Sequence, residues 1–118
     1  MCWENACVSP RNWRERIRDI LDAIAEIESF TLGMDYGSFS VDAKTVKAVE
    51  LNLIVIGEAA SQIPGDVEEQ YPQIPWPPMR AMRNRLVHVY FSVDEKLLGD
   101  TIQNDLPLLV PPLRSLLQ

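Results

Sequence analysis

Bulky apolar residues recur at helical spacing in the first third of the chain. Intervals of 4, 3, 4 and 3 residues separate five of them: Trp13, Ile17, Ile20, Ile24 and Ile27. This spacing places their side chains on one stripe of a helix. Ser9-Pro10 is a typical helix start, because a hydroxyl can cap free N–H groups and proline is tolerated at the first helical position. We expect Gly33 to end this first helix.

A second long helix is predicted from about Val41 to Gln62, ahead of Pro64. Its middle, residues 49–56, is apolar on several faces, which is typical of the central helix of a bundle. The segment between the two helices, Met34 to Phe39, contains glycine and serine and is predicted to be a loop.

Prolines divide the second half of the chain. A turn-rich interval with a short helix at Val67 to Gln70 leads into residues 72–78, where four prolines in seven residues predict a stiff connector. A third helix is expected from Met79 to about Val89. Ser92 and Glu95 match a capping box that would start a fourth helix. Pro107 should kink that helix, and Pro111-Pro112 should break or bend it again.

No segment alternates apolar and polar residues for long enough to indicate a sheet. We therefore predict an all-α fold, an antiparallel bundle of four to five helices. A chain of 118 residues has room for one hydrophobic core. Residues 1–118 are read as a single domain, with residues 1–9 as an irregular N-terminal extension.

The composition is that of a soluble folded protein, with 47% apolar and 24% charged residues. No apolar run approaches the roughly 20 residues that a membrane span needs, and the N-terminus lacks the pattern of a signal peptide. We expect no membrane association and a cytoplasmic protein. Cys2 and Cys7 are interpreted as reduced thiols, and a zinc site is improbable because the one histidine is far away in sequence.

The charge is distributed unevenly. The net charge is −6, which argues against a protein that coats nucleic acid by bulk electrostatics. Residues 79–91 nevertheless contain three arginines and no carboxylate, and the rest of the chain holds 8 basic and 17 acidic groups. One basic window on an acidic chain fits a small site better than a long groove.

His88, inside this basic window, is the natural candidate for proton transfer, because its unperturbed titration lies near neutrality. Asn84 lies one helical turn before it on the same face. Arg83 is displaced by roughly 140° around the helix axis from His88. A two-fold dimer could bring Arg83 of one chain to His88 of the other.

Simpler structural interpretations stand beside these. A lone histidine on a helix is more often a packed or capping residue, and helix arginines usually face solvent. Glu58 interrupts an apolar helix, so it either pairs with Arg83 or Arg85 or is partly exposed without a role. Trp13 and Trp76 are more simply core or interface anchors than base-stacking platforms.

The pattern Arg83-x4-His88-x-Tyr90 resembles the signature of HEPN domains, specifically the HepT-like toxins that pair with minimal nucleotidyltransferase antitoxins of the MntA type. The similarity extends to four segments in family order: residues 52–60, 71–76, 82–90 and 104–109. Together they span most of the chain from about Arg11 onward. One departure is Leu98, where the family pattern suggests a tryptophan.

The resemblance implies a HEPN-like homodimer that cleaves RNA without metal or cofactor. His88 would take the proton of a ribose 2′-hydroxyl or protonate the leaving 5′-oxygen. Arg83 would stabilise the phosphate charge, with Asn84 and Arg85 positioning the substrate. Apart from the resemblance, Glu58 would support the site if it pairs with Arg83 or Arg85. Tyr90 corresponds to the tyrosine that an MntA-type partner modifies with AMP, and the added bulk and charge would obstruct RNA.

Two other functions stay open on the sequence alone. The chain could be a non-catalytic nucleotide- or partner-binding HEPN module associated with a nucleotidyltransferase, with Tyr90 as its modification target. It could also be a helical protein whose only role is assembly. Tyr90 has its own structural alternative, a tyrosine that merely packs near a helix end. The acidic net charge slightly favours these two over a ribonuclease.

Overall fold

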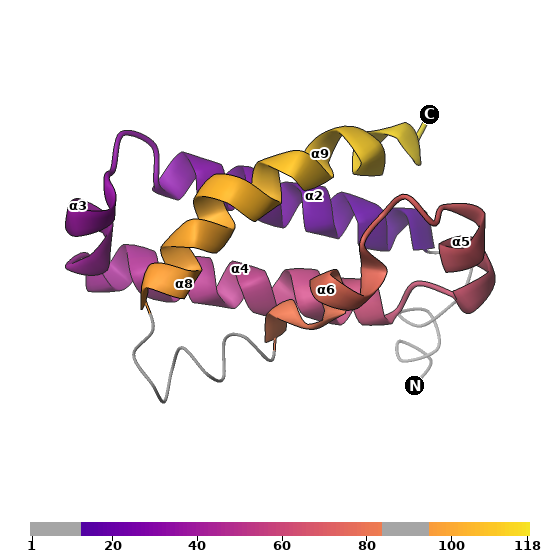
Figure 1. Cartoon of the computed structure of the whole chain (residues 1–118), viewed down its shortest axis with the longest axis horizontal. Helices are drawn as coiled ribbons and strands as arrows, with labels where there is room; N and C mark the ends of the chain where they lie inside the picture. Colours follow the sequence, from indigo (N-terminus) through magenta and orange to yellow (C-terminus); the bar gives the residue numbers. More distant parts are fainter. Residues whose placement is uncertain (1–12, 84–94) are drawn as a thin grey trace, which may run out of the picture.

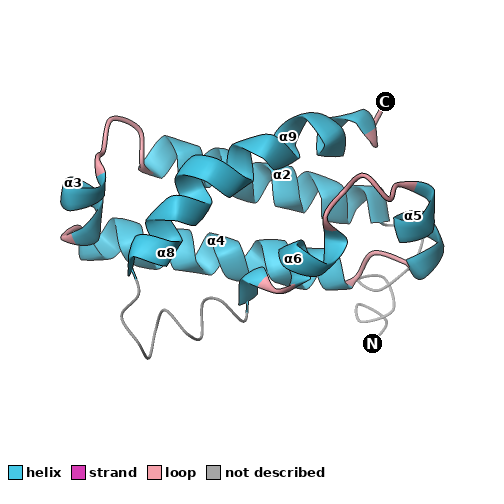
Figure 2. Cartoon of the chain, viewed as in Figure 1, coloured by secondary structure: helices cyan, strands magenta, loops and turns pink. Residues whose placement is uncertain are grey.

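Two long antiparallel helices form the body of the molecule (Figure 1). The computed structural model describes residues 13–83 and 95–118, and these ranges contain helices and turns but no strand (Figure 2). The elements in chain order are α2 (Trp13–Phe30), α3 (Tyr36–Ser40), α4 (Ala43–Ser61), α5 (Gly65–Gln70), α6 (Trp76–Arg80), α8 (Glu95–Asp100), the π-helical turn η2 (Thr101–Asp105) and α9 (Leu106–Ser115). The predicted all-α fold class is confirmed, although the described residues hold seven α-helices where four to five were expected.

The core lies between α2, α4 and α9. The four isoleucines of the apolar stripe of α2 are fully buried, with Ile17, Ile20, Ile24 and Ile27 all 0% exposed. It packs against a buried face of α4 that includes Val49, Leu53, Ile56 and Ala60. Burial of each such isoleucine contributes about 1.5–3 kcal/mol. The helices therefore hold together through the stripe that the sequence spacing predicts.

The ends of the long helices agree with the prediction where the structure describes them. After α2 the chain turns at Gly33, whose φ of 78° favours glycine. The helix α4 begins one residue after Asp42, whose carboxylate accepts the N–H of Thr45 at 3.1 Å. The start predicted at Ser9-Pro10, the N-terminal extension 1–9, and Cys2 and Cys7 lie outside the described residues.

The loop predicted for Met34 to Phe39 is wrong, because residues 36–40 form the short helix α3. Asp35 is its N-cap and accepts the N–H of Ser38 at 2.8 Å. The Ser38 hydroxyl in turn accepts the N–H of Asp35 at 3.1 Å. This reciprocal capping box outweighs the low helix propensity of Gly37 and the two serines.

The third helix begins earlier than predicted. Its start is at Trp76, because Pro77 and Pro78 occupy the first helical positions, where a missing N–H costs nothing. This helix, α6, ends at Arg80, and helical backbone resumes at Met82 and Arg83. The rest of the predicted helix, to Val89, and the start at Ser92 lie outside the described residues.

The last helix continues through two prolines that were expected to break or bend it. Pro111 and Pro112 lie inside α9. The carbonyls of Pro107 and Leu108, one turn earlier, receive no N–H from these prolines. Both residues are exposed, so water can donate hydrogen bonds to their carbonyls. At Pro107, where a kink was expected, the described backbone stays helical and contains a π-helical turn, η2, in which the N–H of Leu106 reaches back to Thr101.

The capping box at α3 has a measurable consequence at low pH. Hydrogen bonds from the backbone and side chain of Ser38 hold the pKa of the Asp35 carboxyl below its ordinary value of 3.8. A depressed folded-state pKa contributes stability that is present above the unfolded value and is lost as pH falls through the folded value. We expect carbon-detected NMR titration to give Asp35 a pKa below 3.8, and Ser38→Ala to raise it. An unchanged pKa in Ser38→Ala would contradict the role of the capping box.

Candidate functional site

Arg83 is placed by a short segment that three buried side chains fix to the core. Trp76, Met79 and Met82 are 3%, 0% and 3% exposed. The indole N–H of Trp76 donates to the carbonyl of Tyr71 at 3.0 Å, so this buried polar atom is satisfied. The expectation that Trp76 is a core anchor is confirmed. Trp13 is half-buried and packs near the ring of Tyr71, with 6.4 Å between ring centroids.

The segment reaches α4 at Gly57, where the two backbones come very close. A Cβ built at Gly57 would lie 3.0 Å from the Cβ of Arg83, 3.1 Å from its backbone nitrogen and 3.3 Å from the carbonyl oxygen of Arg80. No other residue provides this approach, because any Cβ would press on backbone atoms. Gly57 therefore brings Arg83 against the next residue of α4, Glu58.

Glu58 and Arg83 form an ion pair between the guanidinium Nη1 and the carboxylate Oε1. The predicted contact of Glu58 with Arg83 is thus present. The ion pair lies at the surface, whereas the pair considered from the sequence was a buried one: the Arg83 and Glu58 side chains are 57% and 44% exposed. A pair this exposed contributes about 0.2–1 kcal/mol after screening by solvent. Its effect is to orient Arg83 more than to stabilise the fold.

The two described arginines of the basic window, Arg80 and Arg83, have different surroundings. Arg80 pairs with Glu68 of α5 at 2.6 Å, with side chains 36% and 24% exposed. That contact joins α6 to α5 and is structural. The Arg83 side chain is more exposed than that of Arg80. Its guanidinium, with five N–H donors, is therefore the more accessible of the two to a phosphate.

The other predicted site residues, Asn84, Arg85, His88 and Tyr90, lie outside the described residues, and so does the angular relation between Arg83 and His88. Within residues 13–83 and 95–118, no group of three His, Cys, Asp or Glu side chains is arranged to hold a metal ion. No helix in those same ranges is long and apolar enough to cross a bilayer.

Gly57 allows the close approach that places Arg83, and this role was not predicted from the sequence. A glycine in the interior of an apolar helix costs about 1 kcal/mol relative to alanine, so its presence signals a close backbone approach. That signal was available in Ile56-Gly57-Glu58, but the partner of the approach could not be named without the structure.

The fold and this site define a helical-bundle protein in which a solvent-facing arginine, Arg83, is held beside the carboxylate of Glu58. A family model described as ribonuclease HepT-like matches residues 20–116. "Probable ribonuclease HepT" of Thermococcus cleftensis is 41% identical over 99 residues, which cover 84% of this chain and 90% of that protein.

Two further relatives are each named "Putative RNase". A protein of Methanocaldococcus jannaschii is 39% identical over 94 residues, covering 80% of this chain and 78% of the relative. One from Caldanaerobacter subterraneus is 28% identical over 110 residues, covering 93% and 96%. No solved structure matches the chain. The chain belongs to the ribonuclease HepT-like family, so the family and the enzyme class expected from the sequence are confirmed.

The close approach at Gly57 predicts a large effect of one methyl group. In Gly57→Ala the new Cβ would press on the backbone nitrogen and Cβ of Arg83, and overpacking of this kind costs about 1–3 kcal/mol despite the better helix propensity of alanine. We expect a lower free energy of unfolding in urea and a displaced Arg83, seen as lower ribonuclease activity at temperatures where the variant is folded.

Gly65→Ala is the matched control, because a Cβ built at Gly65 has no neighbour within 4 Å. It should leave both the unfolding free energy and the activity close to those of the unchanged protein. Equal effects of the two substitutions would show that the contact between Gly57 and Arg83 is unimportant.

Proposed function

We propose that this protein is a metal-independent endoribonuclease that acts in the cytoplasm as the toxin subunit of a toxin–antitoxin pair. The observation that carries the proposal is Arg83, a solvent-facing arginine oriented by Glu58 in a chain of a ribonuclease family. Arg83 and His88 are the proposed catalytic residues. No metal or cofactor takes part in the proposed reaction.

In the proposed reaction the substrate supplies its own nucleophile. Neutral His88 removes the proton of a ribose 2′-hydroxyl, and the 2′-oxygen attacks the adjacent phosphorus while the bond to the 5′-oxygen breaks. A proton passes to the leaving 5′-oxygen, which leaves a 2′,3′-cyclic phosphate and a 5′-hydroxyl. Arg83 stabilises the charge on the phosphate oxygens, and Asn84 and Arg85 position the substrate. DNA lacks the 2′-hydroxyl and is spared.

Glu58 is proposed as a positioning residue that acts through Arg83. Its carboxylate restricts the guanidinium to one side of α4 before RNA arrives. Because the pair is exposed and therefore weak, an RNA phosphate can compete for the remaining N–H donors at little cost. A buried pair would bind Arg83 too tightly for this exchange.

A homodimer is part of the proposal, and the surface of α4 supports it. Leu51 and Val55 are 62% and 36% exposed and precede Glu58 on the same helical face. Exposed apolar side chains in contact distance of one another are typical of interfaces. A second copy seated on this face would lie beside Arg83, as a site composed of two chains requires.

The proposed regulatory partner is a nucleotidyltransferase antitoxin of the MntA type, which transfers AMP to the hydroxyl of Tyr90. The added phosphate brings negative charge into the basic window of residues 79–91 and repels an RNA phosphate. The alternative, a non-catalytic nucleotide- or partner-binding module, is favoured only by the net charge of −6.

Cleavage assays separate these two functions. The purified protein should cleave RNA in EDTA, while Arg83→Ala and His88→Ala should each lower the rate by roughly 10²–10⁴-fold, as expected for loss of an oxyanion donor or a general base. Glu58→Gln should lower it less. Arg80→Ala is the control, because Arg80 is committed to Glu68. Absence of cleavage, or cleavage lost only in chelator, would contradict the proposal.

Mixing the two inactive variants tests the composite site in the same assay. A heterodimer of Arg83→Ala and His88→Ala chains contains one site with both side chains intact if Arg83 and His88 come from different chains. Co-refolded variants should then recover part of the activity. A mixture as inactive as its components, or a strictly monomeric protein in sedimentation velocity, would rule out a site shared between chains.

Modification of Tyr90 has its own readout. Coexpression with the nucleotidyltransferase should raise the intact mass by one or more AMP groups and abolish RNA cleavage. Tyr90→Phe should show neither effect while keeping its activity, and Tyr71→Phe should behave like the unchanged protein because Tyr71 packs against Trp13. Mass addition that persists in Tyr90→Phe would assign the modification to another residue.

A further inference from the structure

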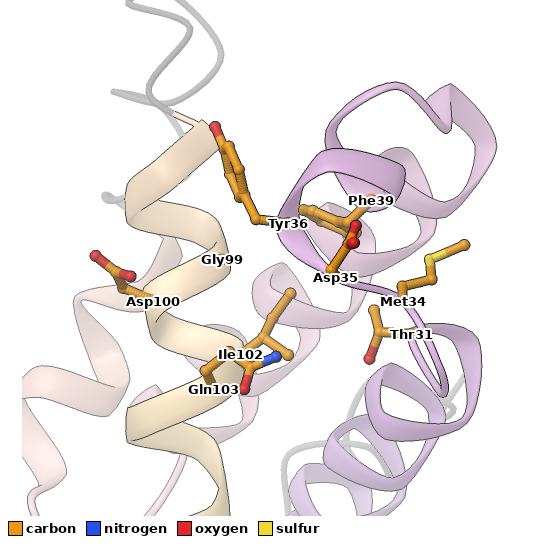
Figure 3. A pocket seen from close by; sticks show the side chains of 9 residues that line it. All are labelled: Thr31, Met34, Asp35, Tyr36, Phe39, Gly99, Asp100, Ile102 and Gln103. Carbon is orange, nitrogen blue, oxygen red and sulfur yellow. The ribbon is translucent and has the colours of Figure 1, made fainter.

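A pocket lies at the opposite end of the bundle from α5, between α3 and the α8–η2 segment (Figure 3). Its volume is about 440 Å³, within the range of roughly 300–1,000 Å³ that is usual for small-molecule sites. The residues that line it come from the α2–α3 turn, α3, α8 and η2. None of them belongs to α4 or α6, which hold Glu58 and Arg83, so the inference does not rest on the proposed nuclease.

The walls of the pocket are mostly apolar. Phe39 is buried, and Phe39, Tyr36 and Ile102 are all among the residues that line the pocket (Figure 3). The ring of Tyr36, 49% exposed, reaches across to α8 at Gly99. A Cβ at Gly99 would lie 3.1 Å from Cδ1 of Tyr36, so the glycine is what allows the ring to close this side.

The polar groups of the pocket are mainly hydrogen-bond acceptors. Asp35 is fixed by the capping box of α3, and the bonds from Ser38 keep its carboxyl pKa below 3.8, so it is ionised at neutral pH. Thr31 donates its hydroxyl proton to the carbonyl of Ile27 at 2.8 Å, so its oxygen offers only lone pairs. Gln103 can serve as donor or acceptor.

Basic side chains are absent from the described lining. The charged lining residues are Asp35 and Asp100, although Asp100 lies on the opposite edge of the α8 ribbon from Tyr36 (Figure 3). A phosphate or carboxylate ligand would thus meet like charge and no cation. An ammonium group would meet the Asp35 carboxylate and the face of an aromatic ring, both of which attract cations.

We propose that this pocket binds a small organic cation that carries an apolar ring, an arylalkylammonium. The ring would occupy the space between Tyr36, Phe39 and Ile102, and the ammonium would lie toward Asp35. The volume accommodates a ring with a short alkyl chain. The described lining offers a phosphate no cation, so it favours an organic cation over nucleotides and RNA.

Three probes of similar shape and different charge test the proposal on the full chain. They are 2-phenylethylammonium, neutral 2-phenylethanol and anionic 3-phenylpropanoate, each titrated into nitrogen-15-labelled protein and followed by amide chemical shifts. The cation should bind most tightly, in the millimolar range expected for so small a ligand, and the anion least. The largest shifts should fall at Phe39, Gly99 and Ile102.

Charge-removing variants locate the ammonium. Asp35→Asn keeps an N-cap acceptor for α3 and removes the carboxylate charge. It should lower the preference for the cation over the alcohol by roughly 2- to 5-fold, the range for one exposed charge pair. Asp42→Asn is the matched control: Asp42 caps α4 in the same way but does not line the pocket. Tyr36→Ala should weaken all three probes.

Several outcomes would overturn the proposal. They are an anion that binds as tightly as the cation, the absence of binding by every probe, shifts centred on residues outside the pocket, and an Asp42→Asn variant that loses as much preference as Asp35→Asn. Cation preference that depends on Asp35 and affinity that depends on Tyr36 would support it.

Discussion

The structure depends on the burial of α4 against two neighbours at once. On one side α4 meets the isoleucine stripe of α2, and on another it meets the α6 segment. The first contact is made by large side chains and supplies most of the hydrophobic free energy. The second is made at Gly57, where the two backbones lie so close that there is no room for a Cβ atom. This second contact determines where Arg83 lies relative to Glu58.

Much of this arrangement could be predicted from the sequence because it depends on periodicity. The 4-3-4-3 spacing in residues 13–27 requires one buried stripe, and four side chains of that stripe are fully buried. Leu98, where the family pattern suggests a tryptophan, is 2% exposed and fills a core position with a smaller side chain. Spacing along one helix is a local property, so one chain segment is enough to interpret it.

What could not be predicted depends on contacts between distant segments or on competing local bonds. The contact of Arg83 with Glu58 joins residues far apart in the chain, and helical phase alone allowed either Arg83 or Arg85. The helix at α3 was missed for a different reason: Gly37 and the serines favour a loop, and only the reciprocal bonds of Asp35 and Ser38 reverse that preference. The pocket beside Tyr36 depends on two segments distant in sequence: α3, which carries Tyr36, and α8, where Gly99 leaves room for the Tyr36 ring.

The π-helical turn connects the core with the pocket. Pro107 has no N–H to give to the carbonyl of Gln103. The N–H of Leu106, which would bond to Ile102 in an α-helix, reaches Thr101. The turn therefore contains one more residue than an α-helical turn. This extra residue changes which face of the helix after the turn lies in line with a given face of the helix before it. After it, Leu106, Leu109 and Leu113 are buried in the bundle, while Gly99 before it and Ile102 and Gln103 within it line the pocket. A regular helix from Glu95 to Ser115 would rotate one of these two sets away from its partner by about 100°, so the wide turn allows a single segment to serve both.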